Sequence, residues 1–210
     1  MRITVDRVAG YKGREAFHLL EKQIYASDPF HIAAPSSIPS DGACFIAYEN
    51  NMPVACCCAR LQTNNPTLGT IGNFQALKNP EAVTAMLTAA ARGLKEQGTE
   101  RIVAPMDGDT WHPYRLNTGP YDAPPFIKEP WNPPYYPSLI ESAGFTVAET
   151  YDSHVVSDPA TAATNQKKFY DRCLKQGYTF NPITAKNFND LLPDIYSFSC
   201  RIFTCNDLYT

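Results

Sequence analysis

Long apolar runs and blocks of basic residues are missing from this sequence of 210 residues. Its longest uncharged apolar run, residues 54–59, is far shorter than the roughly 20 residues that cross a bilayer. The opening stretch MRITVDRVAG alternates polar and apolar residues, without the apolar centre of a signal peptide. A formal net charge of −3 argues against sequence-independent nucleic-acid binding, because such binding rests on Lys and Arg at phosphates. We therefore expect a cytoplasmic protein that binds neither membrane nor nucleic acid.

Metal-ligand spacings and serine-nucleophile motifs are missing as well. No CxxC pair occurs among the seven cysteines, and Cys200 with Cys205 lacks ligand spacing. The consecutive Cys56, Cys57 and Cys58 would point to alternate faces of a strand, so they cannot hold one ion together. The four histidines form no cluster with cysteines or carboxylates, and no GxSxG turn is present. The sequence predicts no metal site, and it predicts buried free thiols.

A globular core is what the composition does provide. Apolar residues make up 44% of the chain and charged residues 19%, which is close to a globular average. Hydrophobic periodicity predicts a strand, a helix and a three-strand meander, at residues 2–8, 14–25, 43–48, 53–61 and 68–77. Asn50-Asn51 is a plausible hairpin turn within the meander. A second helix follows, with Asn79 as N-cap, Pro80 at the first helical position and Gly98 as its end.

The remaining residues predict a less regular second part. We expect a strand at 101–105, a loop at 106–134 that is too long to be a mere connection, and a short helix at 138–143. One bent strand or two successive strands follow at 145–156, then a helix ending at Gln176, a strand at 178–183 and a helix from about residue 185. This order predicts one domain at residues 1–157.

Residues 158–210 carry a weak internal echo of the first helix. Phe17, Leu20, Ile24 and Tyr25 recur at the same spacing in the last predicted helix, as Phe188, Leu191, Ile195 and Tyr196. We interpret residues 158–210 as a connecting helix and the beginning of an incomplete second copy. The apolar residues at 188–203 need a partner surface, and a homo-oligomer would provide one.

Three motifs carry a resemblance to a known family. They are YASDPF (25–30), APMDGDTWHPYRL (104–116) and APPFIKEPWNPPYYPSLIESAGF (123–145). With the order β-α-β-β-β-α-β-α-β-β, the chain resembles the GNAT superfamily of acyl-CoA N-acyltransferases, in a branch of which some members have two GNAT-like halves. The resemblance implies a mixed α/β fold with a mostly antiparallel sheet between helices. It also implies acetyl-CoA or another acyl-CoA as cofactor, and an amine on a small molecule or protein as acceptor.

The cofactor site of active GNAT proteins lies where the third meander strand splays from the next strand. There a Gln/Arg-x-x-Gly-x-Gly/Ala turn presents backbone N–H groups to the pyrophosphate. The corresponding stretch here, NFQALKNPEAV, gives the cofactor-binding candidates Asn73, Phe74, Gln75, Ala76 and Lys78. It departs from the family pattern, because no glycine follows Gly72, Pro80 lacks an N–H, and Glu81 adds a negative charge.

The catalytic tyrosine of the family has no counterpart, since Ile140 stands at its position five residues before Phe145. Our catalytic candidates are His112, Tyr136 and Glu129, because His and carboxylates move protons and a phenol can protonate a thiolate. The substrate-binding candidates, which provide aromatic walls and polar groups for an acceptor, are Trp111, Arg115, Trp131, Asn132 and Tyr135. The competing structural interpretation makes Trp111 a plug for the long loop and pairs Arg115 with Asp107, Asp109 or Glu129.

Two functions of different classes remain open at this point. One is a GNAT-type N-acetyltransferase, in which the amine attacks the thioester directly. The other is a catalytically silent GNAT-like domain that binds a ligand or a partner. The superfamily favours the first, and the changes at Ile140 and in the pyrophosphate turn favour the second.

Overall fold

The structure is a computed structural model, and it describes residues 2–32 and 43–203. The chain forms two compact units, the first ending at Thr146 and the second beginning at Val147. Sequence alone put this boundary at residue 157. Each unit is described by itself below.

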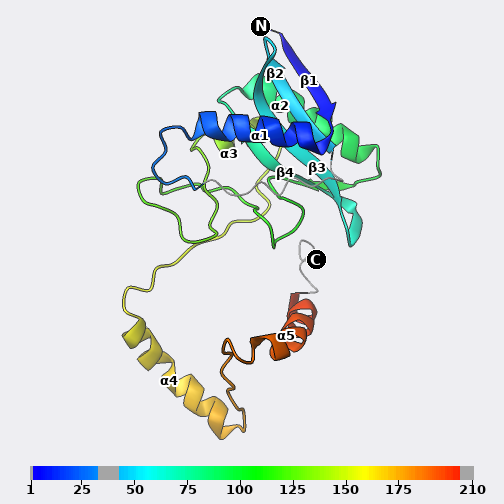
Figure 1. Cartoon of the computed structure of the whole chain (residues 1–210). Coiled ribbons are helices and arrows are strands. Elements are labelled where there is room, and N and C mark those ends of the chain that lie inside the picture. Colours follow the sequence, from blue (N-terminus) through cyan, green and yellow to red (C-terminus); the bar gives the residue numbers. More distant parts are fainter. Residues whose placement is uncertain (1, 33–42, 204–210) are drawn as a thin grey trace. The chain divides into compact units, whose positions relative to one another are not determined.

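A five-stranded sheet forms the centre of the first unit (Figure 1). Its strands are β1 (Ile3–Val8), β2 (Ala43–Glu49), β3 (Met52–Gln62), β4 (Asn65–Ala76) and β5 (Arg101–Val103). They lie in sequence order, with β1 to β4 antiparallel and β5 parallel to β4. This mixed, mostly antiparallel sheet confirms the predicted α/β fold class.

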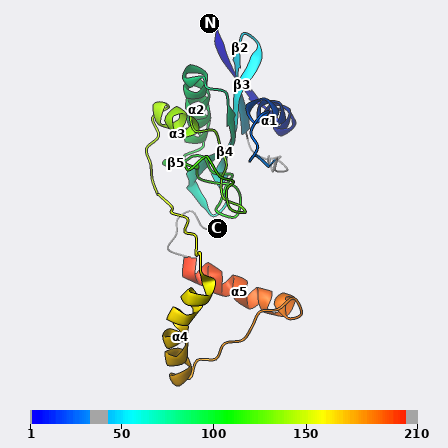
Figure 2. The ribbon, with the colours of Figure 1, turned by 90° about the vertical axis from the view of Figure 1, so that its left-hand side faces the viewer.

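Helices cover both faces of this sheet (Figure 2). Helix α1 (Gly10–Ile24) lies on one face, and α2 (Pro80–Lys95) and α3 (Tyr136–Ser142) lie on the other. Leu20 of α1 is completely buried, and it packs with Ile46 and Cys56 of the sheet. The larger core lies on the opposite face, where the buried stripe of α2 packs against β2, β3 and β4.

Local sequence accounts for the turns and helix ends of this unit. Asn50 and Asn51 both have positive φ, 50° and 66°, as a two-residue hairpin turn between β2 and β3 requires. The Asn79 side chain accepts a hydrogen bond from the Ala82 N–H, and Pro80 follows it, so the predicted start of α2 is confirmed.

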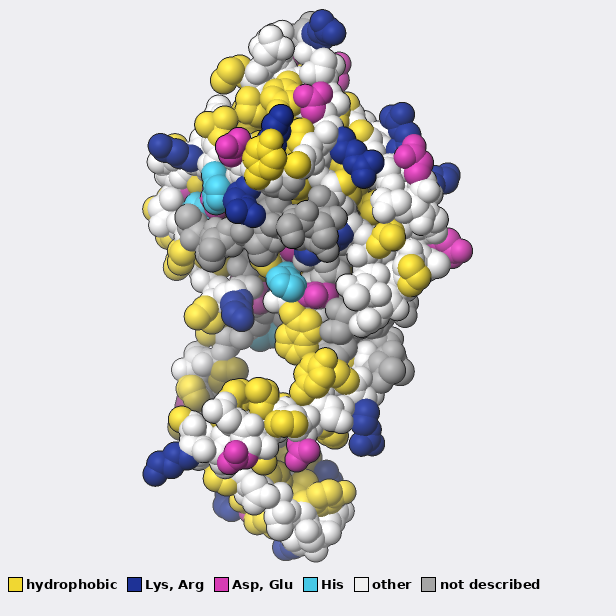
Figure 3. Space-filling view, turned by 45° about the vertical axis from the view of Figure 1, so that its right-hand side comes forward, with side chains coloured by type: hydrophobic (Ala, Val, Ile, Leu, Met, Phe, Trp, Pro, Cys, Tyr) yellow, Lys and Arg dark blue, Asp and Glu magenta, His cyan; other side chains and the backbone are white. Residues whose placement is uncertain are grey.

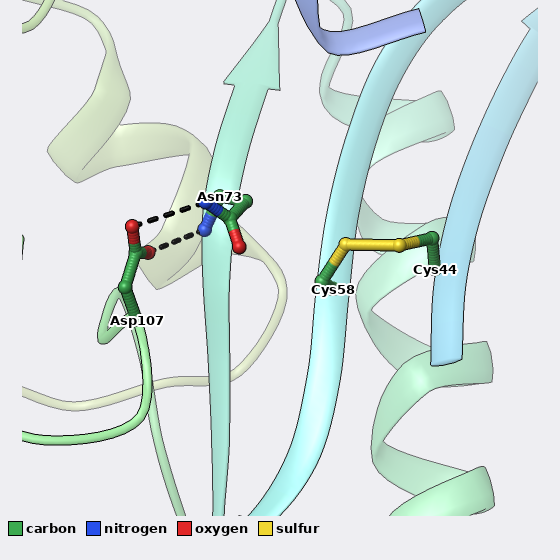
Figure 4. The surroundings of a disulfide bond; sticks show 4 residues. All are labelled: Cys44, Cys58, Asn73 and Asp107. Atoms are coloured by element: carbon green, nitrogen blue, oxygen red, sulfur yellow. Dashed lines mark hydrogen bonds between the residues drawn. A yellow bond between two sulfur atoms is a disulfide. The ribbon is translucent and has the colours of Figure 1, made fainter. Parts of the chain in front are cut away.

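The cysteines correct one expectation. Cys44 of β2 and Cys58 of β3 form a disulfide beneath α1, whereas the sequence predicted free thiols (Figure 4). The pairing follows from register, because the two residues lie directly opposite each other on neighbouring antiparallel strands. Cys56 and Cys57 are free and buried, and burial raises the pKa of the Cys56 thiol to about 12.

Two predicted strands are not formed. Residues 145–156 and 178–183 have no regular secondary structure, and those from 146 onward in the first stretch are exposed. Strands need a neighbour for their backbone groups, and within the described residues β5 is the last strand of the sheet on that side. Alternation of residue types therefore predicted strands for which the described residues form no neighbouring strand.

The second unit contains two helices, α4 (Pro159–Lys175) and α5 (Phe188–Ile202). Neither has a buried residue, although both carry large apolar side chains. Hydrophobic side chains therefore lie at the surface over these helices (Figure 3). Throughout the described part of the chain, no helix has the length and apolar character needed to cross a membrane.

Candidate functional site

The candidate site lies along β4 beyond Thr70, the stretch where the GNAT resemblance of the sequence predicts a cofactor. Strand β4 pairs with β5 only from Leu68 to Thr70 and then continues alone on that side to Ala76. Between Cys56 and Cys58 of β3 the register shifts, and Asn73 of β4 has φ of 47°. A β-bulge at this point bends β4, and it turns backbone groups away from the ladder, so they need other partners.

Asp107 takes up the first of these groups (Figure 4). Its carboxylate accepts hydrogen bonds from the backbone N–H of Asn73 at 2.5 Å and from the Asn73 side-chain amide at 3.1 Å. One residue before Asp107, the Met106 N–H donates to the carbonyl oxygen of Ile71, which lies two residues before Asn73. The chain after β5 thus follows β4 closely, with a carboxylate in the place of the next strand.

This close approach depends on Gly72. A Cβ at position 72 would lie 2.3 Å from an Asp107 carboxylate oxygen and 2.4 Å from the Met106 carbonyl oxygen. The backbone of Asp107 is held as well, because the Arg60 guanidinium of β3 donates to the Asp107 carbonyl oxygen. Asp107 is 8% exposed, and burial raises its pKa, while the Asn73 hydrogen bond and the charge of Arg60 oppose the increase.

Two tyrosine hydroxyls occupy the end of β4. Tyr136 accepts from the Ala76 N–H at 3.0 Å and donates to the Gln75 side-chain oxygen at 2.8 Å. Tyr135 donates to the Ala76 carbonyl oxygen at 3.0 Å. Together they provide the donor and acceptor that a further strand would supply to Ala76.

Burial determines the chemistry of these phenols. Tyr136 is 2% exposed, and burial is the main cause that raises its pKa. Burial also raises the pKa of Tyr25, the next phenol in this group. Burial raises the pKa of Tyr135 as well, so loss of a proton from any phenol of this cluster is harder than from an exposed tyrosine.

The N-terminus of α2 is where the GNAT resemblance of the sequence predicts a pyrophosphate turn. The Ala82 N–H donates to the Asn79 side chain, and the Val83 N–H donates to the Asn79 carbonyl. Pro80 has no N–H to offer. The Asn79 amide also donates to the Glu49 carboxylate at 3.1 Å, and this negative charge adds to that of Glu81 at the same helix end. This helix end has few free backbone N–H donors, and the two carboxylates repel an anion, so it is a poor site for a pyrophosphate.

The loop candidates form pairs of their own. His112 Nδ1 lies 2.7 Å from the Asp109 carboxylate, and both side chains reach the surface. Arg115 lies 3.5 Å from Glu129, which is one of the pairings that sequence considered. Trp111 is 60% exposed, so the interpretation of this residue as a plug is wrong. The Asp109 side chain accepts a hydrogen bond from the Trp111 backbone N–H.

Trp131 and Asn132 position the loop against the body. The Trp131 indole donates to Asp28 at 2.8 Å, and Asp28 also accepts from the backbone N–H groups of Phe30 and His31. Asn132 is buried and accepts from the Asn117 N–H at 2.7 Å. The Trp131 contact ties the long loop to the connector that follows α1, and the Asn132 contact joins two parts of the loop itself.

The predicted site residues therefore fall into separate groups. Tyr135 and Tyr136 lie with Gln75 and Ala76 at the end of β4, whereas His112 pairs with Asp109 and Glu129 pairs with Arg115. Lys78 is exposed beyond the strand. Sequence reasoning missed Asp107 as the residue that contacts β4. The available signal was Gly72 in the interior of β4, since a glycine within a strand can mark a close approach.

No protein-family model matches the sequence, and no curated protein matches it. Solved structures do. One is an aminoglycoside acetyltransferase from an uncultured soil metagenomic sample, in complex with sisomicin, at 15% identity, 74% coverage of this chain, 96% of that chain and a TM-score of 0.45. Another is the ribosomal-protein-alanine N-acetyltransferase of Brucella melitensis biovar Abortus 2308, at 12% identity, with 75% of this chain and 99% of that chain covered and a TM-score of 0.44. A third is an aminoglycoside N-acetyltransferase in complex with CoA, at 11% identity, with 75% of this chain and 96% of that chain covered and a TM-score of 0.44. At these identities and TM-scores, the activity of this chain has to be argued from the site.

Proposed function

We propose that residues 2–146 form a catalytically silent GNAT-like binding domain, in which side chains of the same chain take the place of acyl-CoA along β4. The observation that carries this proposal is the occupied edge of β4. Asp107 accepts from the Asn73 N–H, and the two tyrosines satisfy both backbone groups of Ala76. A pantetheine arm would have to displace these buried hydrogen bonds, and each buried group left unpaired costs about 1–3 kcal/mol.

The helix end supports the same proposal. Asn79 already accepts from one N–H of α2, and Glu49 and Glu81 place negative charge where a pyrophosphate would lie. Both halves of an acyl-CoA molecule, the arm and the diphosphate, thus meet groups that oppose them. The two obstacles are independent, because they involve different residues on different elements.

The surface for partner binding in this proposal is the long loop. Its apolar side chains Phe126 and Ile127 are 52% and 94% exposed, and the indole of Trp111 is exposed as well. Aromatic and aliphatic side chains on a positioned loop are typical anchors of protein interfaces. The hydrogen bonds of Trp131 and Asn132 hold the base of this loop in place.

The second candidate function is N-acetylation of an amine with acetyl-CoA or another acyl-CoA. One observation favours it: β5 leaves β4 after three paired residues, which is the splay that the GNAT resemblance implies. In this function the exposed His112, paired with Asp109, would accept the proton of the attacking amine. Tyr136 would need its hydrogen bonds to Gln75 and Ala76 broken before it could protonate the thiolate.

Calorimetric titration with acetyl-CoA separates the two functions. We expect no saturable heat up to about 1 mM cofactor, a concentration that corresponds to about −4 kcal/mol of binding free energy.

The informative variant is Asp107→Ala, which frees the Asn73 N–H and gives binding if Asp107 is the obstacle. Its matched control is Asp109→Ala, which removes a carboxylate two residues away that does not contact β4. Saturable binding to the unaltered protein, with thiol release when amines are supplied, would overturn the proposal. In that case His112→Ala and Tyr136→Phe identify the catalytic groups.

A further inference from the structure

A hollow of about 240 Å³ lies on the α2 face of the sheet, away from the edge of β4. We call it the α2 hollow. Strands β1 and β2 and the C-terminal half of α2 supply its lining: Val5, Arg7, Phe45, Ala89, Arg92, Gly93 and Glu96. None of these residues belongs to the candidate site above.

The floor of the α2 hollow is apolar. Phe45 is buried in the main core, and Val5 and Ala89 pack against that core. Two small residues on α2, Ala89 and Gly93, keep the helix surface low over the floor. A Cβ at position 93 would already lie 3.4 Å from the tip of the Phe45 ring, so larger side chains there would fill the space.

The rim of the α2 hollow carries two arginines. Within the residues that the structure describes, the guanidinium groups of Arg7 and Arg92 form no ion pair with a carboxylate. A guanidinium presents a planar fork of donors that matches a carboxylate. Two of them beside an apolar floor favour a ligand with one apolar body and one carboxylate.

Glu96 limits the charge of that ligand. Its carboxylate lies on the same rim, so a second negative charge on the ligand would be repelled. The volume also excludes a folded segment or a helix, because about 240 Å³ lies below the usual range for drug-sized ligands. The two limits together select a small monocarboxylate.

We propose that the α2 hollow is a binding site for a small apolar monocarboxylate, with its carboxylate at Arg7 and Arg92 and its apolar body on Phe45, Val5 and Ala89. This site lies apart from the edge of β4, so it does not depend on whether the domain uses acyl-CoA. It would be retained in a silent domain and in an active transferase alike.

The test uses para-fluorophenylacetate as the probe and fluorine NMR of the full chain as the readout. We expect saturable broadening or shifting of the fluorine signal. Arg92→Gln and Arg7→Gln should each weaken binding about tenfold, as is typical for the loss of one hydrogen bond to a charged group. Lys95→Gln is the matched control, since it removes one positive charge from the same helix outside the hollow, and it should change affinity less than about twofold at physiological salt.

A second variant tests the hollow without altering its charge. Ala89→Leu fills the space above Phe45 and should abolish binding while the thermal midpoint stays near that of the unaltered protein. The neutral probe para-fluorobenzyl alcohol should bind at least about tenfold more weakly than the carboxylate. The proposal is overturned if para-fluorophenylacetate does not saturate, or if Lys95→Gln weakens it as much as Arg92→Gln does.

Discussion

Helices α1 and α5 carry the same apolar pattern and have different surroundings. Phe17, Leu20, Ile24 and Tyr25 of the first unit repeat in the second as Phe188, Leu191, Ile195 and Tyr196. Leu20 is fully buried against the sheet, while no residue of α5 is buried within the part of the chain that the structure describes. The pattern predicts a helix and its apolar face, but burial requires a surface that matches that face.

Truncating the equivalent leucines should have the largest effect and separates the two helices most sharply. Leu20→Ala removes a fully buried side chain and should lower the free energy of unfolding of the first unit by about 3 kcal/mol. Leu191→Ala, at the matching position of α5, should change stability by less than about 0.5 kcal/mol. Urea unfolding of the full chain measures both variants.

Leu19→Ala is the control for this comparison, because Leu19 lies beside Leu20 on α1 and is exposed. It should behave like Leu191→Ala. A large loss of stability in Leu191→Ala would show that α5 is packed in solution, and the contrast between the helices would then be wrong.

Gly13 tests how closely α1 packs on the sheet. Its Cβ would lie 2.6 Å from both the Cβ and the sulfur of Cys44, so Gly13→Ala should destabilise the first unit by about 2 kcal/mol. The loss arises because α1 must move away from the disulfide between Cys44 and Cys58. Thermal unfolding under non-reducing conditions measures it.

A double-mutant cycle gives the control for Gly13. With Cys44→Gly and Cys58→Ala in place, both the Cβ and the sulfur next to Gly13 are removed, and Gly13→Ala should cost less than it does in the unaltered chain. An equal cost in both backgrounds would show that the disulfide is not what limits the space at Gly13. Mass spectrometry with a thiol-alkylating reagent shows directly whether the two cysteines are paired.

The helix caps provide a smaller comparison, because α2 and α4 begin in the same way. Asn79 precedes Pro80 and accepts from the Ala82 N–H, and Asp158 precedes Pro159 and accepts from the Thr161 N–H. Asn79→Ala should lower the unfolding free energy of the first unit by about 1 kcal/mol, since α2 belongs to the core. Asp158→Ala should instead reduce helix content, seen by far-ultraviolet circular dichroism, without moving the main unfolding transition. Asn79→Ser keeps a capping oxygen and should restore most of the loss.

The elements of the first unit could be predicted from sequence because their signals are local. Asn79, Pro80 and the stripe from Val83 to Leu94 specify α2 without reference to the rest of the chain. The disulfide could not be predicted in this way. It depends on the register of β2 against β3, which places Cys44 opposite Cys58 rather than opposite Cys56 or Cys57.

The candidate site depended even more on tertiary structure. Sequence marked Gln75, Ala76, Tyr135 and Tyr136 as candidates, but it could not show that the phenols would bond to the strand itself. The contact of Asp107 with Asn73 could not be predicted either, because it spans 34 residues along the chain. Such long-range contacts follow from the path of a loop, which hydrophobic periodicity does not encode.

Two aspartates, one in each unit, should respond to acid in opposite directions, and this is the smallest of the effects. Burial raises the pKa of Asp107, so its charged form destabilises the first unit, and stability rises as the pH falls through its folded pKa toward its unfolded one. Hydrogen bonds from Thr161 lower the pKa of Asp158, so its contribution to α4 is present above the unfolded pKa and is lost as pH falls through the folded pKa.

Between about pH 7 and pH 3, the unaltered chain should therefore gain stability relative to Asp107→Asn in urea unfolding. Over the same pH range, the helix content of the unaltered chain should fall to that of the Asp158→Asn variant. A parallel change in both differences would mean that Asp107 is solvated like Asp158, and the occupied edge of β4 would lose its central residue.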